Sequence, residues 1–256
     1  LLFTTSAVLL RASEWLETYL GIPALTVFAP EKRGGQRVLV LGDGDLSYSA
    51  ALYENKPDVR LVATTLETRE ELVRRYRLAS AHIEALEQAG ALVLHQVDAT
   101  QLVQTLAGEA FPLDGFHRII FNFPYQVPGG IKDLRRLLGA FLEEARKCLA
   151  PDGVIEVALC AGQGGSGVDP SERGWAGCWR VPLLAAKASL ALESVVPWFP
   201  PVGRRFQYAP VREPGNKDGF ESGGGKTFNV GGALLHRLVP CRRAGEEVPS
   251  DGLHAQ

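Results

Sequence analysis

Residues 37–47 read Arg37-Val38-Leu39-Val40-Leu41-Gly42-Asp43-Gly44-Asp45-Leu46-Ser47, and this stretch decides the fold. Its apolar half predicts a buried strand, its glycines predict a tight turn, and the residues after Asp45 predict a helix. In such a turn the first glycine takes a backbone conformation that side chains disfavour, and the second lets a ligand approach the chain closely. Glu67 follows at the tip of the next expected strand, 59–65, where a carboxylate can accept hydrogen bonds from two ribose hydroxyls. The stretch therefore predicts a Rossmann-type unit that binds a nucleoside.

The glycine turn departs from the pattern of dinucleotide-binding proteins at Ser47. A protein that binds a pyrophosphate needs a third glycine at this position, so that the helix packs closely and its free N–H groups face the phosphates. A ligand with a ribose and an adenine but no phosphate fits this turn better, and S-adenosylmethionine is the commonest such ligand. Many methyltransferases have an acid two residues before the first glycine, where this chain has Val40. We therefore expect Asp43 or Asp45 to contact the methionine ammonium.

Further along the chain, apolar runs alternate with segments of helical spacing. Strands are expected over 91–97, 117–121 and 153–160, in addition to the first two. Helices are expected over 69–88 and 131–149, and the turn-forming residues 151–153 should stop the second of them. This alternation predicts an α/β fold, a doubly wound and mostly parallel sheet with helices on both faces.

Polar residues stand at the ends of these strands, where folds of this kind bind their ligands. The candidate cofactor-binding residues are Gly42, Asp43, Gly44, Asp45, Leu46, Ser47, Glu67, Thr68, Asp98, Ala99, Thr100 and Asn122. Several have a simpler interpretation. Asp98 suits the cap of the helix expected near Thr100, Glu67 suits the N-terminus of the helix that follows it, and residues 122–125 suit an ordinary turn. A single ligand site accounts for all of them together.

Four motifs carry a family resemblance. They are Leu-Gly-Asp-Gly-Asp-Leu-Ser-Tyr-Ser (41–49), Ala-Thr-Thr-Leu-Glu-Thr (63–68), Val-Asp-Ala-Thr (97–100) and Ile-Ile-Phe-Asn-Phe-Pro-Tyr (119–125). Together they resemble the Rossmann-like methyltransferase family typified by the fungal large-subunit ribosomal RNA uridine-N-3 methyltransferases. Three later segments are more similar to the relatives found beside a ferredoxin-fold anticodon-binding domain. These are Leu-Cys-Ala-Gly-Gln-Gly-Gly (159–165), Cys-Trp-Arg-Val (178–181) and Phe-Asn-Val-Gly-Gly-Ala-Leu-Leu-His (228–236).

The resemblance implies a seven-stranded Rossmann-like methyltransferase sheet, with S-adenosylmethionine across the first three strand ends and the target base near Asn122. The residues that it implies at the reacting centre are Asn122, Phe123, Pro124 and Tyr125. Relatives usually have His where this chain has Tyr125, which brings the motif nearer to the Asn-Pro-Pro-Tyr of amino-group methyltransferases and leaves the target atom open. The family implies an intracellular, nucleolar protein, with mitochondria as an alternative. About 17 residues follow the last strand-like segment, so no anticodon-binding domain is expected within this chain.

The composition agrees with a single compact domain. With 256 residues, 46% of them hydrophobic, the chain is long enough for one core. We expect a helical N-terminal extension over 1–33, the methyltransferase domain over 34–240 and a C-terminal tail over 241–256. Four widely spaced cysteines indicate neither a zinc site nor a disulfide framework. A metal is therefore not an expected partner. A membrane is not expected either, because no apolar run reaches the about 18 residues of a membrane span.

The charge is unevenly distributed, although the net charge is only −2. Residues 201–243 contain eight Lys or Arg against three acids, with aromatic residues between them. Such a segment can hold single-stranded RNA by phosphate contacts and base stacking, and the family resemblance implies ribosomal RNA or its precursor. The candidate RNA-binding residues are Arg204, Arg205 and Arg212, although a solvated loop explains the charge equally well. Residues 212–226 have too little apolar content to pack, so we expect a mobile loop there.

The expected reaction is in-line methyl transfer from a sulfonium to a ring nitrogen of a uridine in ribosomal RNA. Little acid or base chemistry is needed, because a sulfonium is already activated. Phe123 or Tyr125 would stack on the base. The Asn122 amide oxygen or the backbone carbonyls of the Phe123 turn would accept the proton of a uracil imide or orient the water that does. His95 and His117 flank strands and are interpreted as structural. One alternative is a catalytically inactive methyltransferase-fold protein that holds RNA in ribosome assembly. Another is a nicotinamide-dependent oxidoreductase, against which the missing third glycine argues.

Overall fold

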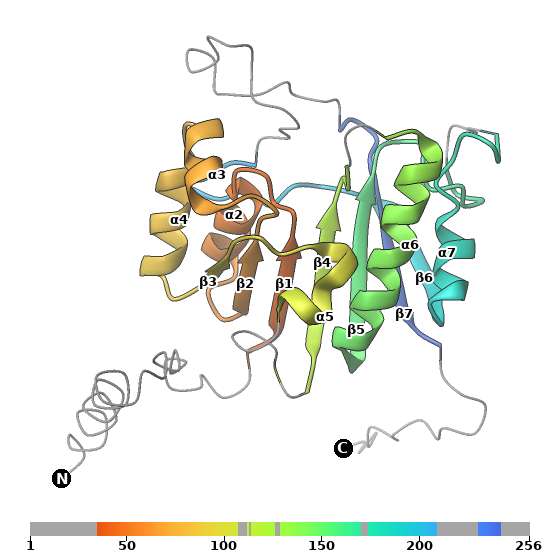
Figure 1. Cartoon of the computed structure of the whole chain (residues 1–256), viewed down its shortest axis with the longest axis horizontal. Coiled ribbons are helices and arrows are strands. Elements are labelled where there is room, and N and C mark those ends of the chain that lie inside the picture. The colour runs from red at the N-terminus through yellow and green to blue at the C-terminus, as the bar shows by residue number, and fades with distance from the viewer. Residues whose placement is uncertain are drawn as a thin grey trace, which may run out of the picture.

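The computed structural model describes residues 35–106, 112, 114–125, 129–169, 174–208 and 230–241. A seven-stranded sheet runs through them in the order β3-β2-β1-β4-β5-β7-β6 (Figure 1). The strands are β1 (Arg37–Leu41), β2 (Arg60–Thr64), β3 (Leu92–Leu94), β4 (Phe116–Asn122), β5 (Leu149–Leu159), β6 (Leu190–Pro197) and β7 (Leu234–Pro240). Strands β1 to β5 pair in parallel, whereas β7 lies antiparallel between β5 and β6. The doubly wound, mostly parallel Rossmann-like sheet expected from the sequence is therefore confirmed.

Helices cover both faces of this sheet (Figure 1). They are α2 (Ser47–Asn55), α3 (Arg69–Arg75), α4 (Ala79–Gln88), α5 (Leu102–Thr105), α6 (Ile131–Cys148) and α7 (Val181–Lys187), with a short 3-10 helix η1 (Ala99–Gln101). Buried residues of α5, α6 and α7 join one core cluster, and those of α2, α3 and α4 join another. The two clusters fill the two sides of the sheet.

Strand β1 is apolar from Val38 to Leu41 because both of its faces are covered there. Leu39 and Leu41 belong to the core on the α6 side, whereas Val38 and Val40 belong to the core on the α2 and α4 side. All four are at most 1% exposed. Burial of a large apolar side chain contributes about 1.5–3 kcal/mol, so β1 is held firmly at the centre of the sheet. The glycine turn that follows β1 is thereby fixed in position.

The expected helix over 69–88 is interrupted at Tyr76, which corrects the sequence analysis. Tyr76 has extended backbone angles (φ −126°, ψ 115°) and separates α3 from α4. The apolar spacing continues through this point, so periodicity alone could not reveal the break. Tertiary packing decides it, because Tyr76 is only 4% exposed and its side chain lines the ligand cleft described below.

Residues 151–153 also differ from expectation. They were expected to form the turn that stops the preceding helix, and α6 does end at Cys148, but β5 already begins at Leu149. The pairing with β4 shifts register between Phe116 and Arg118, so residues 150–153 form an irregular insertion within the strand. The strand expected over 91–97 is likewise shorter, because only Leu92–Leu94 stay in the ladder.

Parts of the expected domain plan lie outside the described residues. These are the N-terminal extension over 1–33, the loop over 212–226 and the tail over 241–256 apart from Cys241. Of the helices that the structure describes, none is both long and apolar enough to cross a membrane. The four cysteines, Cys148, Cys160, Cys178 and Cys241, are all reduced thiols.

Candidate cofactor-binding and active site

A cleft of about 430 Å³ opens at the carboxyl ends of β1, β2 and β4, where ligands bind in sheets of this kind. This volume lies in the range of small-molecule sites. The expected residues that line it are Gly42, Asp43, Gly44, Asp45, Glu67, Asp98, Ala99, Asn122, Phe123, Pro124 and Tyr125. The polar strand ends singled out in the sequence thus meet in one place. Leu46, Ser47, Thr68 and Thr100, which were also candidates, are not among the lining residues.

The glycine turn has the backbone geometry expected of it. Gly42 has φ +58°, in the left-handed region where side chains are disfavoured. A Cβ atom at this position would also lie 3.0 Å from the ring of Phe121. Leu46 has φ +66° and its N–H donates to the Asp43 carbonyl at 3.0 Å, so the turn closes just before α2. Leu46 and Ser47 are at most 1% exposed and support the turn from behind the cleft.

Two carboxylates occupy the start of α2, where a dinucleotide-binding protein would bind phosphate. Asp43 Oδ2 accepts the N–H of Ser49 at 2.6 Å, and Asp45 Oδ1 accepts the N–H of Ser47 at 3.0 Å. Free N–H groups at a helix N-terminus are what attracts an anion. Here they are satisfied by side chains that themselves carry negative charge, so this terminus is unsuited to a phosphate. The structure therefore supports the interpretation of a phosphate-free turn.

Asp43 is buried, and its environment changes the ionisation of its carboxyl group. It is 7% exposed, and burial together with the neighbouring charge of Asp45 raises the pKa of Asp43 to about 7. Its hydrogen bond from Ser49 opposes that rise. A buried carboxylate of this kind is stabilised by a cation placed beside it. The methionine ammonium of S-adenosylmethionine is such a cation.

Glu67 lies on the cleft and is already engaged in an ion pair. Its Oε1 is 2.8 Å from Nη1 of Arg75, which also lines the cleft. A carboxylate accepts hydrogen bonds at both oxygens, so the pair is compatible with a ribose contact. The cap of α3 is supplied by Thr68 and Glu71, which form a capping box. Thr68, expected to contact the cofactor, therefore serves the helix.

Asp98 combines the two interpretations offered for it. Its Oδ1 accepts hydrogen bonds from the N–H of Thr100 at 2.8 Å and from its hydroxyl at 2.7 Å, so it caps η1. Asp98 and Ala99 also line the cleft, whereas Thr100 is held by the cap. The capping interpretation is thus correct, and the capped Asp98 still stands on the wall of the cleft.

Asn122 ends β4 at the floor of the cleft. Both atoms of its amide group, Oδ1 and Nδ2, are buried, and neither has a well-aligned hydrogen-bond partner among the residues that the structure describes, although the Tyr48 hydroxyl lies close enough to interact with the amide. The next residue, Phe123, has φ +49°, a strained conformation for a residue with a side chain. Its N–H donates to the Ala158 carbonyl at 2.9 Å, which ties the turn to β5. Strain and an unsatisfied buried amide at one point indicate a binding function.

Aromatic side chains that sequence reasoning missed surround this amide. Tyr48 lines the cleft beside Asn122, and burial raises the pKa of its hydroxyl to about 12, while Asn122 opposes that rise. Tyr208 packs edge-on against Tyr48 and Trp198, with ring centroids 5.7 and 5.6 Å away. Trp198 in turn contacts Phe123 at 4.9 Å. The ring of Phe123 is therefore packed inside, whereas Tyr125 is 41% exposed at the mouth, where a base can reach it.

The RNA-binding candidates lie apart from the cleft lining. Arg204 and Arg205 are exposed on a segment that passes over α2, and Arg212 lies outside the described residues. The two histidines interpreted as structural do make structural contacts. His95 Nδ1 lies 2.8 Å from the Thr65 hydroxyl, and His117 Nδ1 accepts the N–H of Arg37 at 3.1 Å. Over the described ranges, no three His, Cys, Asp or Glu side chains gather as metal ligands would.

Comparisons with known proteins agree with this geometry. Residues 39–201 match the model of the BMT5-like family, described as rRNA (uridine-N3-)-methyltransferase. The human ferredoxin-fold anticodon-binding domain-containing protein 1 is 34% identical over 205 residues, which are 78% of this chain and 30% of that protein. Its mouse homologue is 34% identical over 167 residues, which are 64% of this chain and 26% of that protein. This chain thus spans less than a third of the length of these two relatives.

Among solved structures, TrmN from Thermus thermophilus is similar with a TM-score of 0.44 and 16% identity, over 92% of this chain and 48% of its own. The family match is much the stronger finding, because it covers more than half of the residues. The cofactor that goes with this family and this cleft is S-adenosylmethionine. The chain belongs to the BMT5-like family of rRNA (uridine-N3-)-methyltransferases.

Proposed function

We propose that the protein transfers a methyl group from S-adenosylmethionine to N3 of a uridine in ribosomal RNA. The family description names this reaction. The observation that carries the proposal for this chain is the buried amide of Asn122, whose donor and acceptor face the Tyr48 hydroxyl and the cleft but have no well-aligned hydrogen-bond partner in the described structure. Leaving two such groups unpaired costs about 1–3 kcal/mol each, so a ligand that pairs with them is favoured.

The edge of uracil suits this amide. Its N3–H is flanked by two carbonyl oxygens, so that edge alternates acceptor, donor and acceptor. Asn122 Nδ2 would donate to one carbonyl, while Oδ1 would accept from the water that removes the N3 proton. This arrangement leaves the line between N3 and the incoming methyl open. The hydroxyl of Tyr48, which stays protonated at neutral pH because its pKa is about 12, adds a second donor nearby.

The chemistry asks little of the protein beyond positioning. S-adenosylmethionine, when bound, supplies a methyl group already activated on a sulfonium. The N3–carbon bond would form with the nitrogen electron pair as the sulfur–carbon bond breaks, and the N3 proton would leave to the water that Asn122 Oδ1 orients. Donors such as Asn122 Nδ2 stabilise the negative charge that the uracil carbonyls acquire, which is how preorganised hydrogen bonds lower a barrier. Holding the base in line accounts for most of the remaining acceleration.

A test uses the purified chain, S-adenosylmethionine and ribosomal RNA from cells that lack the protein. Mass spectrometry of the nucleosides should detect 3-methyluridine after incubation with the parent protein. Detection of a different methylated nucleoside would show that the target atom is not N3 of uridine. Binding of cofactor and RNA without any methylated product would instead indicate an inactive RNA-holding protein.

A further inference from the structure

We infer that Glu54 is a positioning residue for the cofactor cleft. It holds the segment 198–208 against α2, and this segment carries Tyr208 into the cleft wall. The inference rests on the proposed function in one respect, namely that this cleft binds S-adenosylmethionine. It assigns a role to residues that lie outside the strand ends and that no motif of the chain singles out.

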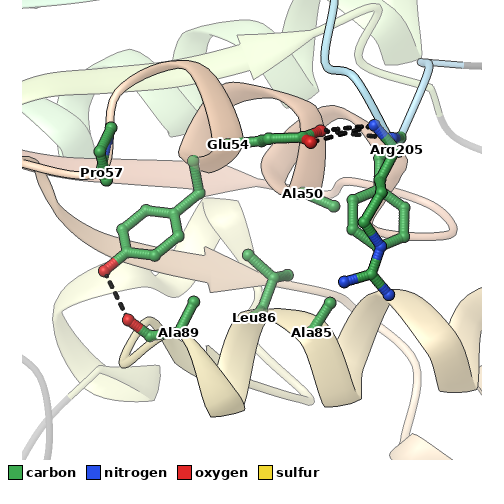
Figure 2. Close-up of a pocket in the computed structure, with 9 residues that line it drawn as sticks. Ala50, Glu54, Pro57, Ala85, Leu86, Ala89 and Arg205 are labelled. Carbon is green, nitrogen blue, oxygen red and sulfur yellow. Dashed lines mark hydrogen bonds between the residues drawn. The ribbon is translucent and has the colours of Figure 1, made fainter.

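The attachment is a carboxylate that accepts backbone N–H groups. Glu54, near the end of α2, accepts the N–H of Arg205 at 3.0 Å with both of its oxygens, and Oε2 also accepts the N–H of Phe206 at 3.3 Å. Figure 2 shows Glu54 directed from α2 towards the backbone of Arg205, above a hollow of about 250 Å³ between α2 and α4. Hydrogen bonds to an ionised acceptor are about twice as strong as those between neutral groups.

Neighbouring contacts shape the segment for this attachment. Asn55 Nδ2 donates to the Val202 carbonyl at 2.8 Å, and Val202 bridges to Gln207 in antiparallel fashion. At Gly203, a Cβ atom would collide with the Glu54 carboxylate and would come within 2.6 Å of the Phe206 carbonyl oxygen. Only glycine therefore allows the turn to approach Glu54 as closely as it does.

The segment buries little apolar surface at its turn. Phe199 and Val202 are 80% and 71% exposed. Hydrophobic burial of these two side chains therefore cannot be what holds the turn in place, since the stabilisation scales with the apolar area removed from water. The polar attachment through Glu54 and Asn55 holds this turn, whereas Trp198 and Tyr208, at the two ends of the segment, pack against the core on the α2 and α4 side.

The attached segment affects the cleft in two ways, through the contact of Phe206 with His82 and directly through Tyr208. Phe206 packs edge-on against His82 at 5.2 Å, and His82 Nδ1 lies 2.8 Å from the carbonyl of Asp45 in the glycine turn. Tyr208 lines the cleft itself, and its hydroxyl is near enough to Asp43 and Asp45 for their charges to raise its pKa, in addition to the larger effect of burial. Removal of the Glu54 attachment should therefore be felt where the methionine end of the cofactor is expected.

The experiment combines two measurements on the full chain. Calorimetry gives the affinity for S-adenosylhomocysteine, and hydrogen exchange gives the protection of the backbone N–H groups of 203–206. Glu54→Ala should accelerate exchange there and weaken binding by about five-fold or more, because the released segment no longer holds Tyr208 against the cofactor. Glu54→Gln keeps one acceptor oxygen and should lie between the parent and Glu54→Ala. Glu84→Ala, an exposed glutamate on the adjacent α4, is the matched control and should change neither measurement.

A double-mutant cycle separates positioning from general destabilisation. Tyr208→Ala should weaken binding while exchange of 203–206 stays slow, and adding Glu54→Ala to it should weaken binding no further, since both changes act through the same side chain. Additive effects on affinity, or faster exchange in Glu54→Ala with unchanged affinity, would overturn the inference. A parent protein that binds S-adenosylhomocysteine but methylates no RNA would overturn the proposed function and leave this result standing.

Discussion

The carboxylate of Asp43 accepts the backbone N–H of Ser49 at 2.6 Å, inside the first turn of α2. This hydrogen bond fills the anion-binding end of the helix with the protein's own charge, and burial makes that charge costly. A ligand that brings a positive group to Asp43 relieves the cost, whereas a ligand that brings phosphate increases it. The site therefore favours S-adenosylmethionine over a nicotinamide dinucleotide through its ground-state electrostatics.

Cofactor affinity should depend on the ionisation of Asp43. Because its pKa is raised to about 7, Asp43 is mostly protonated at pH 6 and ionises as the pH rises through 7. If the ionised form binds the methionine ammonium, affinity should rise by about five-fold between pH 6 and pH 7, from the linkage of one proton. Calorimetry over this range measures it, since the ammonium stays charged throughout. The Asp43→Asn variant should bind the cofactor more weakly, and its affinity should not change with pH over this range. If the affinity of the parent does not depend on pH, the ammonium is bound by Asp45 instead.

Glu67 should contribute to binding through the ribose. We expect micromolar affinity for S-adenosylmethionine, roughly −7 to −8 kcal/mol, and a decrease of about ten-fold or more in Glu67→Ala. Glu70→Ala removes an exposed acid of α3 and serves as the control. Calorimetric titration of the three proteins decides the matter. Tighter binding of a nicotinamide dinucleotide to the parent would refute the methyltransferase assignment.

Asn122 should matter for the reaction more than for the cofactor. Asn122→Ala should lower the single-turnover methylation rate by about a hundred-fold or more, near 3 kcal/mol, because small displacements from an in-line geometry are costly. Cofactor affinity should stay within a few-fold of the parent. Asn122→Asp keeps an oxygen but replaces the Nδ2 donor, so it should be no better than Asn122→Ala. An undiminished rate in either variant would remove Asn122 from the reaction.

RNA binding should draw on Arg204 and Arg205, which are exposed on the segment above α2. Replacing both by Gln should weaken RNA binding and reduce its salt dependence by about 0.7 for each single-strand phosphate that is no longer neutralised. Arg136→Gln, an exposed arginine of α6, is the control. Filter binding over a series of salt concentrations measures the slope. If the slope is unaltered, the basic segment is a solvated loop and RNA binds elsewhere.

Gly42→Ala should destabilise the protein, because φ +58° is unfavourable for alanine by about 1–2 kcal/mol and the new Cβ atom would press on Phe121. Gly90 also has a positive φ, +89°, but no atom lies within 4 Å of a Cβ built there. Gly90→Ala therefore reports the cost of the backbone conformation alone. Urea denaturation of both variants should show the larger decrease in stability for Gly42→Ala. Equal decreases in stability would mean that the Phe121 ring moves away from the new Cβ atom without destabilising the protein.

The sheet and its polar strand ends could be predicted because their signals are local. An apolar run followed by Gly42 and Gly44 specifies strand, turn and helix within a few residues, and parallel strands bring Glu67 and Asn122 to the same edge. The break at Tyr76 could not be read in this way, since the apolar spacing runs through it. It depends on a tertiary contact that only the folded chain contains.

The aromatic wall of the cleft was missed for a related reason. Trp198 and Tyr208 come from a segment after β6, far along the chain from the glycine turn. In the sequence Tyr208 is one of the aromatic residues of the basic segment 201–243, where it suggests RNA stacking, and nothing there places it or Trp198 at the cofactor cleft. Thr68 and Thr100, which were expected to contact the cofactor, do not line the cleft, and the sequence could not show this because a strand end and a helix start share the same residue types. Their hydroxyls are engaged in helix capping.

The antiparallel insertion of β7 has a consequence for how such a protein can change over evolution. Pro197 pairs with Leu234, so the connection between β6 and β7 leaves the sheet and returns to it at the same edge as Asn122. The pairing of β6 with β7 therefore does not depend on the length or the charge of the connection between them. A lineage could change the charge of this connection around Arg204 and Arg205, and with it the RNA that is bound, provided that Trp198 and Tyr208 continue to shape the cofactor cleft.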